Sequence, residues 1–181
     1  MANLFDYVAW RGDISFDTIP FNKIDALLLS HLSYSPLNGL VPSSFEESKT
    51  LSQLSKDFKA ASDYEDRLKI GFVINKNTPE LLAKTAKSLR FKNVRICGYR
   101  EIFSEENVEQ FAAMTYIIKN GKNEEVIISY RGTDDTLVGW KEDFNIVWQD
   151  QIPAQKDALV YIEDAAKFFK NGFVIVGHSK G

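Results

Sequence analysis

The sequence predicts an α/β fold in which a helical N-terminal third is followed by a mixed β-sheet. Apolar residues recur at helical spacing up to about Leu89, and the pattern then changes to the continuous apolar runs that are typical of strands. Two of these runs flank Asn120-Gly121, the strongest short signal for a β-hairpin. A strand, a helix and another strand follow, which predicts a right-handed β-α-β crossover between parallel strands.

Three helices are expected in the first half of the chain. The apolar spacing predicts the first over residues 22–35. The second is expected to begin near Ser44, because Glu47 follows it at the spacing of a capping box. Thr78 is expected to cap the third, with Pro79 in the first turn, where a helix needs no N–H donor. Residues 1–90 therefore form a mainly helical segment.

The second half of the chain predicts the sheet. The runs with strand composition cover residues 94–99, 113–119, 125–130 and 173–177. A helix over residues 153–170 separates the last two. Residues 173–176 are all apolar, which is typical of a strand buried on both faces in the centre of a parallel sheet. We expect one domain over residues 1–181, with the sheet core in residues 91–181.

Composition and charge restrict the kind of protein. With 44% hydrophobic and 26% charged residues, the chain has the balance of a soluble globular domain. A net charge of -3 without a basic stripe argues against a nucleic-acid partner. No leader sequence or membrane-length apolar run is visible, so a cytoplasmic location without stable membrane insertion is expected. Cys97 and two histidines predict no disulfide, metal or cofactor, and the oligomeric state is open.

Residues 177–181, Gly-His-Ser-Lys-Gly, carry the G-x-S-x-G pattern directly behind an apolar strand. This pattern predicts a nucleophile elbow, a sharp turn that exposes a serine hydroxyl, and Ser179 is the candidate nucleophile. Gly177 and Gly181 are expected to let neighbouring backbones pass closely. The backbone N–H of Lys180 is a candidate donor to the oxyanion of an acyl-transfer intermediate.

A second oxyanion donor is expected from a loop at the carboxyl end of a neighbouring strand. Arg131, Gly132 and Thr133, which we call the oxyanion loop, directly follow the strand that ends at Tyr130. Thr133 can therefore offer a backbone N–H and a hydroxyl beside the elbow.

These motifs resemble a known family. Tyr-Arg-Gly-Thr at 130–133, Trp140 with Asp143, and Val-Gly-His-Ser-Lys-Gly at 176–181 resemble the class 3 lipase branch of the α/β-hydrolases. Three further segments are similar to the bacterial Mbeg1-like group: residues 134–136, 139–144 and 152–155. The resemblance covers roughly the whole chain.

The resemblance implies the N-terminal part of an α/β-hydrolase fold and a serine hydrolase acting on a small-molecule carboxylic ester. It makes Thr133 the oxyanion-hole residue and assigns Trp140 and Asp143 to holding the oxyanion loop, with Arg131 and Gly132 as further support. Residues 152–155 read Ile-Pro-Ala-Gln, where secreted class 3 lipases carry His-x-Gly-Phe. This departure weakens the inference of a triglyceride substrate.

The catalytic base and acid are expected outside this sequence. In α/β-hydrolases the triad runs serine, acid, histidine in chain order, so both partners of Ser179 should follow Gly181. We therefore expect the N-terminal portion of a longer hydrolase, inactive by itself. His31 falls on the apolar stripe of the first helix and is expected to pack. The ring of His178 is expected to point away from the nucleophile.

Other interpretations stay open. The chain could be a non-catalytic binding or interaction module, and thioesterases and peptidases use the same elbow. Residues 172–179 imitate a phosphate-binding loop, but histidine replaces the lysine that would reach the phosphates. Trp148 could line an acyl pocket or cover the sheet edge. Four acids are expected to be solvated or to cap a turn, not to bind a metal: Asp134, Asp135, Glu142 and Asp143.

Overall fold

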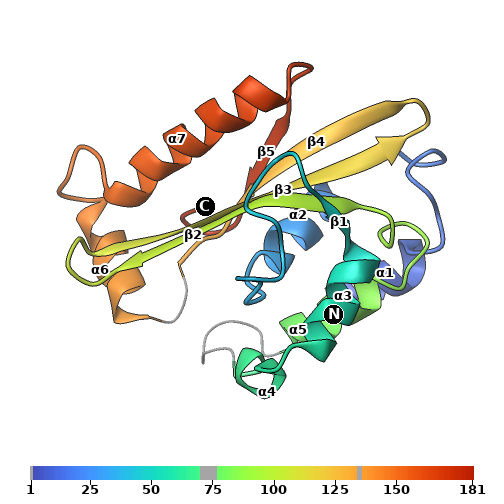
Figure 1. The fold of residues 1–181 in the computed structure, drawn as a ribbon, viewed down its shortest axis with the longest axis horizontal. Helices are drawn as coiled ribbons and strands as arrows, with labels where there is room; N and C mark the ends of the chain where they lie inside the picture. The colour runs from blue at the N-terminus through green and yellow to red at the C-terminus, as the bar shows by residue number, and fades with distance from the viewer. Residues whose placement is uncertain (1, 70–76, 134–135) are drawn as a thin grey trace.

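Helices cover both faces of a single sheet (Figure 1). The structure, a computed structural model, describes residues 2–69, 77–133 and 136–181. Helix α7 (Pro153–Phe168) lies on one face of the sheet, and the helices of the N-terminal segment lie on the other. The predicted α/β fold class, with helices first and a mixed sheet after them, is confirmed.

Six helices precede α7 in the described residues. They are α1 (Leu4–Arg11), α2 (Lys23–Leu32), α3 (Leu51–Ala60), α4 (Tyr64–Arg67), α5 (Thr78–Thr85) and α6 (Leu137–Asn145). Helix α2 begins where the sequence predicts, because the Asn22 side chain accepts from the N–H groups of Ile24 and Asp25. The Asp25 carboxylate accepts in return from the Asn22 N–H at 3.0 Å, which completes a capping box.

The sheet has five strands in the order of the chain. They are β1 (Lys49–Thr50), β2 (Arg95–Ser104), β3 (Glu109–Asn120), β4 (Asn123–Tyr130) and β5 (Val174–Gly177). The first four pair antiparallel, and β5 pairs parallel to β4. The predicted hairpin at Asn120-Gly121 is confirmed, with Gly121 at a φ of 61°. The predicted β-α-β order with parallel strands is confirmed too, since α7 lies between β4 and β5 in the chain and these strands pair parallel.

Alternate residues of β3 enter two different cores. Met114, Tyr116 and Ile118 pack with the N-terminal helices, whereas Phe111 and Ala113 pack with α7. This follows from the strand geometry, in which successive side chains point to opposite faces. Both faces of β3 are therefore buried, and the strand lies between two packed layers.

The helix predicted to begin near Ser44 is wrong. The carbonyls of Pro42 and Ser44 accept hydrogen bonds from the N–H groups of Tyr99 and Gly98 in β2, at 2.9 and 3.0 Å. These bonds hold the segment against the sheet, where β2 has a bulge and Gly98 has a φ of 62°. Helix α3 begins instead after Thr50, whose hydroxyl caps it. Non-local pairing therefore prevailed over a local capping pattern.

Other helix assignments differ from the predictions as well. Asn77, not Thr78, takes the N-cap position of α5, with Thr78 and Pro79 in its first turn. Helix α6 was not predicted at all, although the sequence drew attention to Trp140 and Asp143 within it. The helix expected over residues 153–170 is confirmed, two residues shorter at its C-terminal end.

Strand β5 lies at the edge of the sheet, so the prediction that it is buried on both faces is wrong. It pairs with β4 on one side, and within the described residues no strand pairs with its other side. Val174 and Ile175 are consequently 42% and 50% exposed. Val176 alone packs against the N-terminal core.

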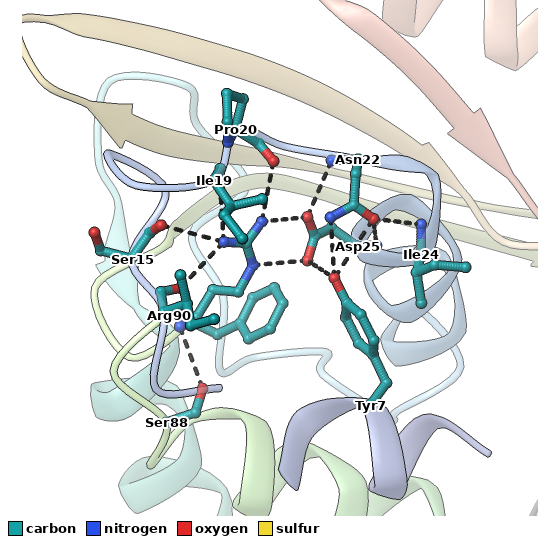
Figure 2. Close-up of polar contacts among 11 residues, drawn as sticks. Tyr7, Ser15, Ile19, Pro20, Asn22, Ile24, Asp25, Ser88 and Arg90 are labelled. Carbon is teal, nitrogen blue, oxygen red and sulfur yellow. Dashed lines mark hydrogen bonds and ion pairs between the residues drawn. The ribbon is translucent and has the colours of Figure 1, made fainter. Parts of the chain in front are cut away.

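A buried ion pair ties the N-terminal segment together (Figure 2). The Arg90 guanidinium donates to both carboxylate oxygens of Asp25, at 2.9 and 2.5 Å, and both side chains are almost completely buried. The Tyr7 hydroxyl donates to the same carboxylate at 2.8 Å. Arg90 also donates to backbone carbonyls between α1 and α2, those of Ile14, Ile19 and Pro20. The pair thus joins α1, α2 and the segment after α5.

Candidate active site

Ser179 lies in a sharp turn directly after β5. Its φ of 60° falls in the left-handed region, which a residue with a side chain rarely adopts. The turn is closed by a hydrogen bond of 3.1 Å from the N–H of Gly181 to the carbonyl of His178. A backbone of this kind stores about 1–3 kcal/mol and persists only where its surroundings hold it, which is common at functional sites.

Glycine is required on both sides of this turn for steric reasons. A Cβ on Gly177 would collide with the backbone of Gly181. A Cβ on Gly181 would collide in turn with the carbonyl of Tyr130 and would lie 2.9 Å from the carbonyl carbon of Arg131. The elbow therefore passes so close to the end of β4 that only hydrogen fits at these positions.

The oxyanion loop lies beside the elbow. Tyr130 pairs with Gly177 in the parallel register, so the residues that follow β4 and β5 leave the sheet at the same edge. A Cβ on Gly132 would lie 2.7 Å from Ser179 Cβ and would collide with the carbonyl of His178. Gly132 and Ser179 are therefore in direct contact, although 47 positions separate them in the chain.

Helix α6 supports the oxyanion loop through Asp143. The Thr133 hydroxyl lies 2.7 and 2.6 Å from the two carboxylate oxygens of Asp143, to which it donates. Because that proton is engaged, the group that Thr133 can offer an oxyanion is its backbone N–H. Arg131 is fixed separately, by an ion pair of 2.7 Å with Glu101 of β2. The indole of Trp140 is half exposed, and its expected part in holding the loop stays a prediction.

Lys180 anchors the other side of the elbow in a buried cluster. Its ammonium donates to Glu142 at 2.5 Å and to the carbonyl of Gln110 at 3.1 Å, and it lies 3.9 Å from Asp143. The fully buried carboxylate of Glu142 also accepts from the N–H groups of Gln110 and Ala154, both at 3.1 Å. Glu142 therefore connects the elbow, the start of β3 and the start of α7.

The prediction that Glu142 is solvated is wrong, and sequence reasoning missed its role. Val138, Gly139 and Glu142 share the buried side of α6, at the spacing of one helix face. That spacing could have predicted the burial of Glu142 from the sequence, but only after residues 137–145 had been assigned to a helix. Trp148, whose place was left open, is exposed.

Both histidines lie near the elbow. Nδ1 of His178 is 3.0 Å from the hydroxyl of Tyr34, and the two rings meet edge to face. Nε2 of His31 is 3.4 Å from the hydroxyl of Thr78. Burial, and next the charge of His178, lower the pKa of His31. In the described residues neither imidazole forms a hydrogen bond with Ser179.

The described residues contain no cluster of three or more histidine, cysteine, aspartate or glutamate side chains that could hold a metal ion. Asp134 and Asp135, which were considered as part of such a cluster, lie outside the described residues. No helix in the described part of the chain has the length and apolar character needed to cross a membrane.

The comparisons with known proteins concern the part of the chain that holds the site. A model of the Mbeg1-like family matches residues 85–181. These residues include strands β2 to β5, the oxyanion loop and the elbow. No curated protein and no solved structure gives a significant match.

Proposed function

Since the chain belongs to the Mbeg1-like family, we propose that it is a serine hydrolase with an α/β-hydrolase fold of the class 3 lipase type, which cleaves carboxylic esters. The observation that carries the proposal is the contact between Ser179, at a φ of 60°, and Gly132 of the oxyanion loop. A strained, glycine-flanked serine beside a backbone loop is the arrangement that acyl transfer requires.

The residues of the site take distinct parts in this chemistry. The Ser179 oxygen attacks the acyl carbon and forms a new C–O bond, while the carbonyl oxygen becomes an oxyanion. The backbone N–H groups of Thr133 and Lys180 stabilise that charge. The Ser179 proton passes to a histidine, the general base of this class of hydrolase, and then to the departing alcohol. The oxyanion collapses to a carbonyl as the C–O bond to the alcohol breaks, which leaves an acyl-serine ester. Water then hydrolyses this ester, which releases the carboxylic acid and regenerates the Ser179 hydroxyl.

Exposed apolar side chains beside the oxyanion loop favour an ester with an apolar acyl group. Leu137, Trp140 and Phe144 of α6 are all at least half exposed. The same helix supplies Asp143, which holds Thr133, so this apolar surface begins within a few residues of the proposed oxyanion site. An acyl chain that leaves the site along α6 would cover side chains that otherwise contact water.

A fluorophosphonate probe tests the nucleophile, because it forms a stable adduct only with an activated serine. The protein should give one adduct, mapped by mass spectrometry to Ser179. Ser179→Ala should abolish the adduct, whereas Ser48→Ala, at an exposed serine far from the elbow in sequence, should leave it unchanged. Undiminished labelling of Ser179→Ala would refute the assignment.

A substrate panel separates the ester from its alternatives. We expect hydrolysis of p-nitrophenyl esters, with a preference for medium acyl chains over acetate, and slower turnover of matched thioesters and amides. Faster turnover of the thioester or the amide would reassign the protein to a thioesterase or a peptidase. A labelled serine without turnover of any of the three would favour a binding module.

A further inference from the structure

We propose that Tyr34 is a positioning residue of the site, whose hydroxyl donates to Nδ1 of His178 and so holds the elbow against the oxyanion loop. The inference rests on the proposed function of Ser179. It assigns part of the site to the N-terminal helical segment, and Tyr34 itself lies outside the residues matched by the family model.

Tyr34 reaches the elbow from the end of α2. Its N–H donates to the carbonyl of His31 at 3.2 Å, which fixes its backbone in the turn that directly follows the helix. The side chain is buried, and a buried phenol needs a hydrogen-bond partner for its polar end. His178 Nδ1 lies at hydrogen-bond distance from this hydroxyl, at 3.0 Å, although the two residues are 144 positions apart in the chain.

The Tyr34 hydroxyl lies where the two halves of the site meet. A Cβ on Gly132 would lie 2.6 Å from this hydroxyl and 2.7 Å from Ser179 Cβ. The Tyr34 hydroxyl and the Ser179 side chain therefore both border the small space next to the Cα of Gly132. A displacement of Tyr34 would open this space and allow the elbow to move away from the loop.

The hydrogen bond between Tyr34 and His178 matters because the backbone of Ser179 is strained. A left-handed serine is kept in place only if its neighbours are held. Lys180, on one side, is bound to Glu142 of α6 at 2.5 Å. His178, on the other side, is bound to Tyr34. The nucleophile is thus clamped from two parts of the fold, one of which is the N-terminal segment.

The direction of the hydrogen bond follows from the chemistry of the two groups. A phenol O–H is a good donor, and the unprotonated nitrogen of a neutral imidazole is a better acceptor than a phenol oxygen. His178 should therefore carry its proton on Nε2. The ring of His31 lies at a centroid distance of 6.1 Å from the ring of Tyr34. Burial lowers the pKa of His31 below its ordinary value of 6.5, so this imidazole is neutral at pH 7.5.

Nitrogen-15 NMR of the two imidazoles reads this tautomer directly. Signals lost in His178→Leu belong to His178, and signals lost in His31→Gln belong to His31. At pH 7.5 we expect His178 in the Nε2–H form. Tyr34→Phe keeps the ring and removes the hydroxyl, so His178 should then exchange between both tautomers. An unchanged tautomer in Tyr34→Phe would overturn the proposal.

The rate of fluorophosphonate labelling measures the consequence for Ser179. Tyr34→Phe should label roughly fivefold to tenfold more slowly, as expected for one lost hydrogen bond. Tyr64→Phe, at a partly buried tyrosine of α4, should label at the wild-type rate. Equal rates for Tyr34→Phe and the wild type would also overturn the proposal.

Variants of His178 test the same hydrogen bond from its other partner, again by the rate of fluorophosphonate labelling. They also keep the proposal testable if Tyr34→Phe does not fold. His178→Asn, whose Oδ1 can accept the same hydrogen bond, should label faster than His178→Leu, which has no acceptor. Equal rates for these two would count against the proposal. If the wild-type protein does not react at Ser179, the proposed function fails by itself, and the tautomer of His178 still decides whether Tyr34 makes this bond.

Discussion

Ser179 depends on contacts made by the residues on either side of it. The hydrogen bond of Tyr34 to His178 holds one side, and the ion pair of Lys180 with Glu142 holds the other. Glu142 is the more deeply embedded of the two anchors, because it is fully buried and accepts from two backbone N–H groups as well. Breaking a buried charge pair leaves the remaining charge without compensation, which is a large penalty.

We therefore predict that Glu142→Gln destabilises the protein by about 3–5 kcal/mol. An amide has one acceptor oxygen for three donors, and its NH2 group would face another donor. Urea unfolding measures the effect, with Glu163→Gln at an exposed position of α7 as the control, expected within about 0.5 kcal/mol of wild type. Lys180→Met should couple with it, so that the double variant loses less than the two single losses together. Glu142→Gln with wild-type stability would contradict the role given to this carboxylate.

The parts of the site that the sequence could predict are those specified by local chemistry. The elbow pattern requires glycine within two residues of Ser179, and the collisions at Gly177 and Gly181 supply the physical reason. Tyr34 and Glu142 were not predictable in the same way. They meet their partners across 144 and 38 positions of the chain, and no local pattern encodes such a pairing.

At the scale of elements, the start of α2 illustrates when a local signal succeeds. Its capping box, Asn22 with Asp25, is reinforced by the Arg90 ion pair, so local and tertiary demands agree (Figure 2). A capping pattern was also expected at Ser44, where the backbone instead binds β2. A capping pattern predicts a helix only where the carbonyl groups of the same residues do not accept hydrogen bonds from the sheet.

For α2 we predict that Asp25→Asn lowers stability by about 3–5 kcal/mol, since it leaves the Arg90 charge buried without its partner. Replacing both partners with apolar residues, as in Asp25→Leu with Arg90→Met, is often neutral for a simple ion pair. Here we expect the double variant to stay less stable than wild type, because three backbone carbonyls would lose the donor that Arg90 provides. These are the carbonyls of Ile14, Ile19 and Pro20. Thermal unfolding followed by circular dichroism decides this. A double variant that regains wild-type stability would show that those carbonyls need no donor.

At the scale of the whole molecule, the sheet separates two cores, one formed with the N-terminal helices and one formed with α7. The start of β3 links the sheet to the site. Glu109 opens this strand, and the next residue, Gln110, bonds to both Lys180 and Glu142. A hydrogen bond with Asp157 of α7, then burial, and then the charges of Asp157 and Glu142 raise the pKa of Glu109 from 4.5 to about 7. Below about pH 7 a protonated Glu109 carboxyl group therefore joins β3 to α7.

This shift predicts that stability falls as the pH rises from about 4.5 to about 7. In that window folded Glu109 binds a proton that the unfolded chain has released, so a rise in pH favours unfolding. His31 acts in the opposite direction, because its lowered pKa makes the folded state lose stability as the pH falls below about 6.5. Variants of Glu109 and of an exposed neighbour separate the contribution of Glu109 from that of His31. Glu109→Gln, a permanent neutral donor, should remove the decline in urea midpoint between pH 5 and pH 7.5, and Glu106→Gln, at an exposed neighbour, should retain it. The same decline in Glu109→Gln and in wild type would assign the pH dependence to another group.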